Sequence, residues 1–206
     1  MITIITSVRD TESFNCLKRN LINFEPDWKI GLDLICVIKN EKLFLESRDF
    51  LLENVNRGEC RIVFGDSLQS ANQYLTDKNP YVFVLAENIL IPPGGITKLY
   101  ESFIQKPRAG FISGVFKEYP TVYWVRDIYG TPQYIYSNEK EDYDLLMDVD
   151  VSMPYGLLTS TQNYKEFFGM SNLEGYGSYS YGIRLRRQGY KNYVNTGVEY
   201  KHGGKK

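Results

Sequence analysis

The sequence predicts an α/β protein built on a doubly wound, mostly parallel sheet flanked by helices. In the first half of the chain, short apolar, β-branched runs alternate with segments whose apolar residues recur at helical spacing. Such alternation is typical of a parallel sheet with helices on both faces. The run from Tyr81 to Leu85 is almost continuously apolar, as expected of a central strand that is buried on both faces.

Four strand–helix units are expected in this first half. The strands are predicted at residues 2–6, 32–38, 61–64 and 81–85, and the helices at 14–22, 43–55, 68–75 and 96–104. Thr11 or Ser13 is the expected N-cap of the first helix, and Asp66 or Ser67 that of the third. Short oxygen-bearing side chains suit this position because they accept hydrogen bonds from the free N–H groups of the first turn.

The second half of the chain, after Pro107, predicts shorter strands and a smaller antiparallel sheet. Strands are expected at 109–116, 121–125, 133–136, 148–153, 190–194 and 198–200, with helices at 163–168 and 183–188 and a flexible tail at 202–206. Gly156-Leu157-Leu158, between the strand at 148–153 and the helix at 163–168, is not assigned to an element. The chain contains no linker and no internal repeat. We therefore expect one domain over residues 1–206, with a nucleotide-type half at 1–106 and a substrate half at 107–206.

Composition excludes several classes of protein. With 43% hydrophobic and 24% charged residues, the chain can bury a sizeable core. A net charge of -1 offers no basic field for nucleic acid. No stretch approaches 18 apolar residues and no leader pattern opens the chain, so we expect a cytoplasmic protein without a transmembrane segment. Peripheral membrane attachment and homo-oligomerisation are left open.

Few residues are available for metal or covalent chemistry. Cys16, Cys36 and Cys60 lie in or beside apolar runs, which favours reduced, buried thiols over a disulfide or a metal cluster. His202 is the single histidine, so a zinc site with several histidines is excluded. The dinucleotide motif G-x-G-x-x-G and the Walker motif are both absent.

The end of the predicted central strand carries the best candidate for ligand chemistry. Glu87 and Asn88 follow this strand directly, before a Pro-Pro-Gly-Gly break. Ligands of open α/β sheets bind outside the carboxyl ends of the strands, and oxygen donors at that place suit a divalent cation beside a phosphate. A polar strand end that leads into a surface turn is the simpler interpretation.

Five stretches, taken in order, resemble the GT-A glycosyltransferases and especially the family-2-like members. They are the first strand with Ser7 and Arg9 after it, Val37-Ile38-Lys39-Asn40, the segment 65–72, the segment 84–93 with 109–114 behind it, and the closing segment 183–190 with Tyr200-Lys201-His202. The resemblance implies a GT-A, Rossmann-like fold with an antiparallel sheet on the acceptor side. It also implies a metal-assisted, hexosyltransferase-like transfer of sugar from a nucleotide-sugar donor to an acceptor hydroxyl, with inversion.

The resemblance also implies roles for particular residues. The nucleotide would be contacted by Ser7, Arg9, Asn40, Ser67, Asn72 and Glu87. A Mn²⁺ or Mg²⁺ ion would be held by Glu87, Asn88 and His202. This ion would stabilise the charge that grows on the diphosphate leaving group.

Two motifs depart from the family pattern. Ala86-Glu87-Asn88 stands where Asp-x-Asp is usual, which leaves one carboxylate and predicts weaker metal affinity. Gly177-Ser178 stands where a Glu-Asp pair is usual, so the customary catalytic base is missing. Glu174 is the nearest replacement and Asp150 the second. Two alternatives therefore stay open, a catalytically inactive GT-A-like binding or assembly subunit and a nucleotidyltransferase. The donor sugar, the base and the acceptor are not specified by the sequence.

Overall fold

The structure is a computed structural model that describes residues 1–55, 57–116, 121–128, 131–137, 145–152, 156–168 and 177–203. A nine-stranded sheet contains β1 (Ile2–Val8), β2 (Leu32–Ile38), β3 (Cys60–Phe64), β4 (Tyr81–Leu85), β5 (Ile89–Leu90), β6 (Ala109–Phe116), β9 (Leu146–Val149), β10 (Gly156–Ser160) and β11 (Lys191–His202). A two-stranded antiparallel sheet contains β7 (Thr121–Ile128) and β8 (Thr131–Ser137). The helical elements are α1 (Thr11–Asn23), η1 (Glu25–Ile30), α2 (Glu41–Asn54), η2 (Leu68–Tyr74), α3 (Gly95–Ile104), α4 (Thr161–Asn163), η3 (Tyr164–Phe168) and α5 (Gly177–Arg187).

The large sheet is mostly parallel, as the sequence predicts. Its strand order is β3-β2-β1-β4-β10-β6-β11-β5, with β9 also paired to β11. The strands β1 to β4, β6 and β11 run in one direction, while β10 is antiparallel to both of its neighbours. The chain leads from β1 to β2 and β3 on one side, whereas β4 pairs with β1 on the other. The order of strands therefore reverses between β1 and β4.

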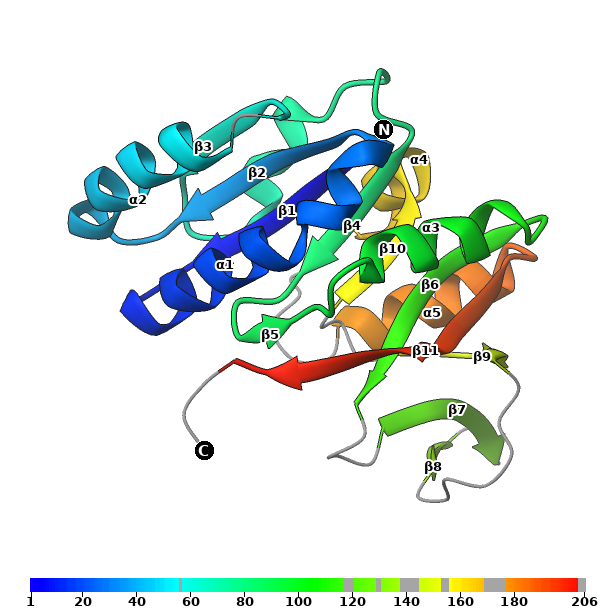
Figure 1. Ribbon diagram of the computed structural model, residues 1–206. Coiled ribbons are helices and arrows are strands. Elements are labelled where there is room, and N and C mark those ends of the chain that lie inside the picture. The colour runs from blue at the N-terminus through cyan, green and yellow to red at the C-terminus, as the bar shows by residue number, and fades with distance from the viewer. Residues whose placement is uncertain are drawn as a thin grey trace.

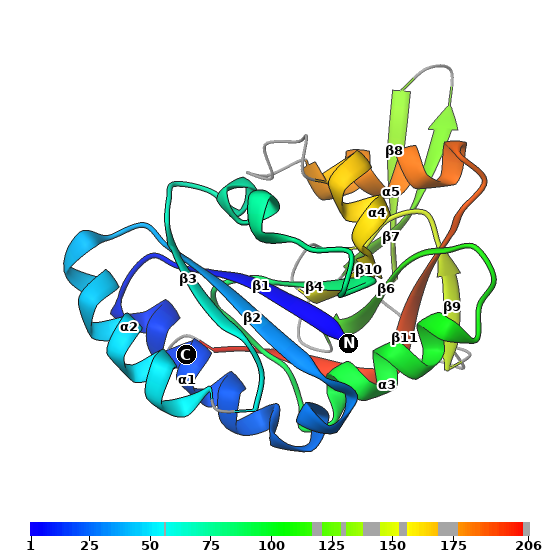
Figure 2. The same ribbon diagram turned by 90° about the horizontal axis from the view of Figure 1, so that it is seen from above.

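Two apolar cores, one on each face, fix the helices against this sheet. Successive side chains of a strand point to opposite faces, so Ile4 and Phe83 belong to one core while Ile5 and Val84 belong to the other. The first core is covered by α1, α2 and α3, and the second by η2, η3 and α5. Figure 2 shows these two groups of helices on opposite sides of the sheet. The predicted α/β architecture with helices on both faces is confirmed.

The start of α1 differs from the prediction. Its N-cap is Asp10, rather than Thr11 or Ser13. The Asp10 carboxylate accepts a hydrogen bond of 2.8 Å from the Ser13 backbone N–H, and Ser13 Oγ accepts one of 3.0 Å from the Asp10 N–H. This reciprocal capping box satisfies two free donors at once. The hydrogen bonds from Ser13 lower the pKa of Asp10.

The end of the chain differs more. Residues 191–202 form one strand, where two short strands and a flexible tail are predicted. An irregularity between Val194 and Glu199 lets β11 continue along β6, and its last residues, Lys201 and His202, pair with β5. Gly203 beyond them is buried. Residues 204–206 lie outside the described residues.

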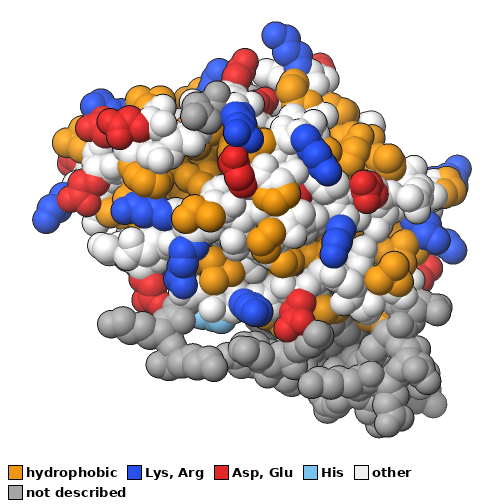
Figure 3. All heavy atoms as spheres, viewed as in Figure 1, with side chains coloured by type: hydrophobic (Ala, Val, Ile, Leu, Met, Phe, Trp, Pro, Cys, Tyr) orange, Lys and Arg blue, Asp and Glu red, His pale blue; other side chains and the backbone are white. Residues whose placement is uncertain are grey.

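The surface and the cysteines agree with the composition. Lys and Arg side chains are interspersed with Asp and Glu side chains on the face that carries α1 and α3 (Figure 3). All three cysteines are free, with Cys16 and Cys36 buried and Cys60 partly buried. Among the helices that the structure describes, none has both the length and the apolar character needed to span a bilayer.

Candidate functional site

A cluster of three polar side chains lies at the carboxyl ends of β1 and β4. The two strands are parallel neighbours, with Thr6 opposite Leu85, so the residues that follow them meet. Ser7 Oγ donates a hydrogen bond of 2.6 Å to Glu87 Oε1, and Arg9 Nε lies 3.2 Å from Glu87 Oε2. Both carboxylate oxygens of Glu87 thus have a partner. The Glu87 side chain is 16% exposed, whereas that of Arg9 is 61% exposed.

The place of this cluster in the sheet indicates its role better than its small contribution to stability does. An ion pair with one exposed partner contributes only about 0–1 kcal/mol to stability, so Arg9 and Glu87 are not paired mainly to hold the fold together. They lie where the order of strands reverses between β1 and β4. In open α/β sheets, ligands bind in the crevice beside such a switch point. An exposed guanidinium beside a mostly buried carboxylate can donate hydrogen bonds to an anion there, while the carboxylate can bind a cation.

The end of β11 reaches the same edge of the sheet. His202 pairs with Ile89 of β5, the residue that directly follows Glu87-Asn88 in the chain. The N–H of Gly203 donates a hydrogen bond of 2.7 Å to the backbone carbonyl of Asn88. Figure 1 shows β5 between α1 and the end of β11. The structure therefore brings the strand-end residues Glu87 and Asn88 and the backbone of His202 together.

The side-chain oxygen of Asn88 is an unusual feature of this turn. It is buried and has no hydrogen-bond partner among the residues that the structure describes. Leaving a buried acceptor unsatisfied costs about 1–3 kcal/mol. An ion or a water molecule commonly satisfies such a group, so Asn88 is chemically suited to contribute an oxygen ligand.

The other residues predicted to contact a nucleotide follow the neighbouring strands. Backbone hydrogen bonds of 3.2 Å from Lys39 to Val8 and from Gly65 to Ile38 join the ends of β1, β2 and β3. Asn40, after β2, is exposed and accepts a hydrogen bond of 3.2 Å from the Leu43 N–H as the N-cap of α2. Ser67 precedes η2 and Asn72 lies within it, and both are half-buried. Asn40 and Ser67 therefore lie beyond the ends of β2 and β3, whereas Asn72 lies within η2, which packs on the second core.

Of the two predicted catalytic bases, Asp150 is described by the structure, and it is not brought to this cluster. Asp150 follows β9, whose last residue Val149 pairs with Asn192 near the start of β11, at the opposite end of the sheet. Its carboxylate lies 3.2 Å from Arg186 Nε, because α5 packs beside this end of β11. Glu174 lies outside the described residues.

A set of contacts from α1 was missed by the sequence interpretation. Cys16, Arg19, Asn20 and Asn23 contact β5, the segment after it or Gly203 through hydrogen bonds. Their spacing places them on one side of the helix. Ile22, one of the apolar residues whose helical spacing predicts this helix, is 74% exposed. The helical spacing of these three polar residues and a cysteine is the feature of the sequence from which this contact surface could have been predicted.

The donor set for a metal ion is small. In the part of the chain that the structure describes, no group of three or more His, Cys, Asp and Glu side chains is arranged to hold an ion. The ligands on offer at this edge are the Glu87 carboxylate, the unsatisfied Asn88 oxygen and the His202 imidazole. One negative charge suits a weakly bound divalent cation whose remaining ligands come from a substrate phosphate or water.

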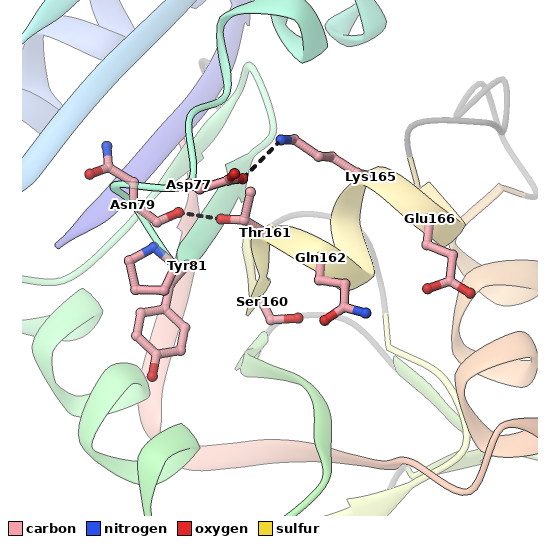
Figure 4. Close-up of a pocket in the computed structure, with 9 residues that line it drawn as sticks. Asp77, Asn79, Tyr81, Ser160, Thr161, Gln162, Lys165 and Glu166 are labelled. Carbon is pink, nitrogen blue, oxygen red and sulfur yellow. Dashed lines mark hydrogen bonds and ion pairs between the residues drawn. The ribbon is translucent and has the colours of Figure 1, made fainter.

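A cavity of about 780 Å³ lies elsewhere, at the opposite end of β4 (Figure 4). It is lined by Asp77, Asn79, Pro80, Tyr81, Ser160, Thr161, Gln162, Lys165 and Glu166. Lys165 Nζ lies 3.6 Å from Asp77 Oδ1 across it. Because Tyr81 begins β4 and Glu87 follows its end, this cavity is separate from the Glu87 cluster.

Comparisons with known proteins identify the fold. No family model and no curated protein sequence matches this chain. A mannosyltransferase from Pyrobaculum calidifontis, solved with GDP-mannose and Mn²⁺, matches with a TM-score of 0.67 and 12% identity, over 100% of this chain and 57% of that one. A 4-diphosphocytidyl-2C-methyl-D-erythritol synthase from Anaerococcus prevotii matches with a TM-score of 0.61 and 13% identity, over 100% of this chain and 91% of that one.

At this level of identity the likeness is one of fold. The chain has a GT-A-like, Rossmann-like α/β fold, and the fold expected from the sequence is confirmed. It spans little more than half the length of the mannosyltransferase.

Proposed function

We propose that the protein is a nucleotide-sugar-dependent glycosyltransferase whose donor diphosphate binds at the carboxyl ends of β1 and β4. The observation that carries the proposal is the contact of Ser7 and Arg9 with Glu87 at the point where strand order reverses. The GT-A-like fold supports it, since a mannosyltransferase with this fold was solved with GDP-mannose and Mn²⁺.

Arg9 and Glu87 take complementary roles in this proposal. The exposed Arg9 guanidinium turns from Glu87 to the arriving diphosphate, to which it donates charge-assisted hydrogen bonds. The Glu87 carboxylate, still held by Ser7, becomes available to a cation. Asn40 and Ser67 extend the same edge along β2 and β3, and with Asn72 of η2 they would contact the nucleoside.

A divalent cation fits the donors at this edge. Glu87, Asn88 and His202 would hold it, and the unsatisfied oxygen of Asn88 supports that assignment. Imidazole as a ligand favours Mn²⁺ over Mg²⁺. When bound, the ion supplies Lewis-acid stabilisation of the charge on the departing diphosphate. The single carboxylate predicts that the ion binds weakly unless the nucleotide is present.

The transfer itself needs a base rather than a protein nucleophile. The acceptor hydroxyl oxygen forms a bond to the anomeric carbon while the bond from that carbon to the diphosphate oxygen breaks, and a carboxylate receives the hydroxyl proton. We propose Glu174 for this role. Asp150 is a weaker choice because its carboxylate is paired with Arg186.

Ligand-dependent stability tests the proposal. We expect one of UDP, GDP and CDP to raise the melting temperature only when Mn²⁺ is present, since a ligand at a hundred times its Kd stabilises the folded state by about 2.7 kcal/mol. The effect should be lost in Glu87→Gln and reduced in His202→Ala. Glu101→Gln is the matched control, because Glu101 is an exposed carboxylate on α3. The proposal is wrong if no nucleoside diphosphate stabilises the wild-type protein with or without metal.

A nucleotidyltransferase is the second candidate, favoured by the match that spans 91% of the synthase. The two reactions release different products. A glycosyltransferase releases a nucleoside diphosphate from a nucleotide sugar, whereas a nucleotidyltransferase releases pyrophosphate from a nucleoside triphosphate and a sugar phosphate or similar acceptor. The segment from Ser7 to Asp10, at the carboxyl end of β1, contains no glycine to wrap a triphosphate, which disfavours the second reaction. Binding without either product would support an inactive relative.

A further inference from the structure

The side chain of Asn20 in α1 forms hydrogen bonds with the two peptide groups on either side of Leu90, in the short strand β5 that follows the proposed donor site. The Asn20 side chain is almost completely buried. Asn20 Nδ2 donates a hydrogen bond of 2.7 Å to the Ile89 carbonyl, and Asn20 Oδ1 accepts one of 2.9 Å from the Ile91 N–H. A side-chain amide that both donates to and accepts from the backbone makes the two hydrogen bonds that a neighbouring strand would otherwise make. This matters because β5 is only two residues long.

Two further residues on the same side of α1 extend this contact. The Cys16 thiol donates to the Ile89 carbonyl at 3.5 Å, and Asn23 Nδ2 donates to the Ile91 carbonyl at 2.8 Å. Burial raises the pKa of Cys16 to about 11, so the thiol keeps the proton that it donates. Apolar side chains at these positions would leave the backbone groups of Ile89 and Ile91 without these partners, which costs about 1–3 kcal/mol for each buried group. The polar face therefore both stabilises β5 and fixes its position, because these hydrogen bonds form only in one register.

Helix α1 also holds the segment that follows His202. Arg19 Nη2 donates a hydrogen bond to the Gly203 carbonyl, and the Gly203 N–H is bound to the Asn88 carbonyl at 2.7 Å. A Cβ on Gly203 would lie 2.4 Å from Cys16 Sγ, which is too close for any side chain. Gly203 is thus enclosed by α1 on one side and by the Glu87-Asn88 turn on the other.

We infer that Arg19 and Asn20 are positioning residues of the proposed donor site, because α1 holds β5 and the end of β11 and so determines where Asn88 and His202 lie. The inference rests on the proposed function. The proposed donor site then consists of two parts, each held by a different element of the fold. Glu87 is held from β1 by Ser7 and Arg9, whereas Asn88 and His202 are held from α1.

Arg19→Met tests the inference without disturbing the core, since Arg19 is exposed. It removes the donor to Gly203 and leaves Ser7, Arg9 and Glu87 in place. Removing a partner that orients a metal ligand typically weakens metal affinity about 10–100-fold. We expect the Mn²⁺ affinity measured with the nucleoside diphosphate to fall at least about tenfold. Gly203→Ala should act in the same direction, because the added methyl group displaces the segment from Cys16.

Lys18→Met is the matched control. It also removes a cation from α1, one residue away, but the Lys18 ammonium lies over the rings of Phe14 and Phe50 instead of the segment after His202. Its Mn²⁺ affinity should equal that of the wild type. The same comparison with Asn20→Leu, which removes both contacts to β5, shows whether the β5 contacts matter separately from the Gly203 contact.

The single histidine gives a readout that is independent of activity. We would titrate Mn²⁺ alone, and then Mn²⁺ with UDP, GDP and CDP in separate samples, and follow paramagnetic broadening of the His202 ring signals by NMR. Amide hydrogen exchange at Gly203 would be measured on the same variants. The expected result is faster exchange at Gly203 and a rise of about tenfold in the Mn²⁺ needed for half-broadening in Arg19→Met, with neither change in Lys18→Met.

The two possible failures are distinct. If Arg19→Met speeds exchange at Gly203 but leaves the Mn²⁺ titration of His202 unchanged, the contact is only structural and the positioning role is overturned. If the wild-type protein itself binds no nucleoside diphosphate with Mn²⁺, the proposed function is what fails.

Discussion

The two ends of β4 both carry polar side chains, yet they differ in how those side chains are held. At the carboxyl end, one oxygen of Glu87 is bound by Ser7 near the end of β1 and the other by Arg9 just after it, at the point where strand order reverses. At the amino end, Tyr81 opens a cavity whose ion pair, Lys165 with Asp77, is longer and has a fully exposed carboxylate. The cavity of about 780 Å³ therefore lies at the end whose ion pair is longer and more exposed. Convergence of held polar groups at a switch point is a better guide to function here than cavity volume.

The largest expected difference between the two ends concerns one tyrosine at each. Tyr200 is buried near the carboxyl end, where its hydroxyl donates to the Gly156 carbonyl at 2.7 Å and accepts from the Gly114 N–H at 2.8 Å. Tyr200→Phe leaves the Gly114 N–H buried and unpaired, while the Gly156 carbonyl loses one of its two side-chain donors and keeps Ser113 Oγ at 2.9 Å. We therefore expect a loss of about 2–4 kcal/mol in the free energy of unfolding. Urea denaturation measures it.

Tyr81→Phe is the matched change at the amino end. The Tyr81 ring packs against Tyr100 and Phe103, and phenylalanine keeps those contacts. We expect a change within about 0.5 kcal/mol. Equal losses in the two variants would contradict the view that the carboxyl end is the more tightly bonded region.

The second-largest expected difference is in nucleotide affinity when the cation of each ion pair is removed. Arg9→Met removes a charge-assisted hydrogen bond to the diphosphate, which is worth about 1.5–3 kcal/mol, or roughly 10–100-fold in affinity. Lys165→Met removes the corresponding cation at the cavity and should leave affinity unchanged. Calorimetry with the stabilising nucleoside diphosphate and Mn²⁺ gives both values. A loss in Lys165→Met alone would move the ligand to the cavity.

The smallest expected effect is a pH-dependent one at the two helix N-caps. Asp10→Ala should cost about 1 kcal/mol at neutral pH. Because the fold lowers the pKa of Asp10 below 3.8, its contribution is present above that value and is lost as pH falls through the lowered pKa. Ser160 caps α4 near the amino end through a hydrogen bond of 3.0 Å to the Asn163 N–H. Ser160→Ala should show a deficit that does not vary over this acid range, and denaturation series at several pH values compare the two.

The sequence predicted the bounds of a strand well where the residues of that strand alone are enough to identify it. The strands Leu32–Ile38, Tyr81–Leu85 and Ala109–Phe116 were placed at their observed bounds, because a continuous apolar, β-branched run is a local property. It also placed Ser7 and Arg9 after the predicted first strand and Glu87 after the fourth. Their contact with one another was not predicted, and their grouping as nucleotide-binding residues came from the resemblance to the GT-A glycosyltransferases.

Features that depend on distant contacts were not predictable in this way. Asn20 faces inward and Ile22 outward because β5 offers backbone groups to the helix, and periodicity assigns apolar residues to the inside. The segment from His202 onward has the composition of a flexible tail, yet pairing with β5 orders His202. Asp150 was considered as a base because the register of β9 against β11, which places it at the other end of the sheet, is not encoded locally.

A crystal structure with Mn²⁺ and the nucleoside diphosphate that stabilises the protein tests the central claim most directly. The account predicts diphosphate density beside Glu87 and Arg9, with the ion within bonding distance of Glu87. Density in the cavity beside Tyr81 and Lys165, with the contacts of Glu87 to Ser7 and Arg9 unchanged, would contradict it.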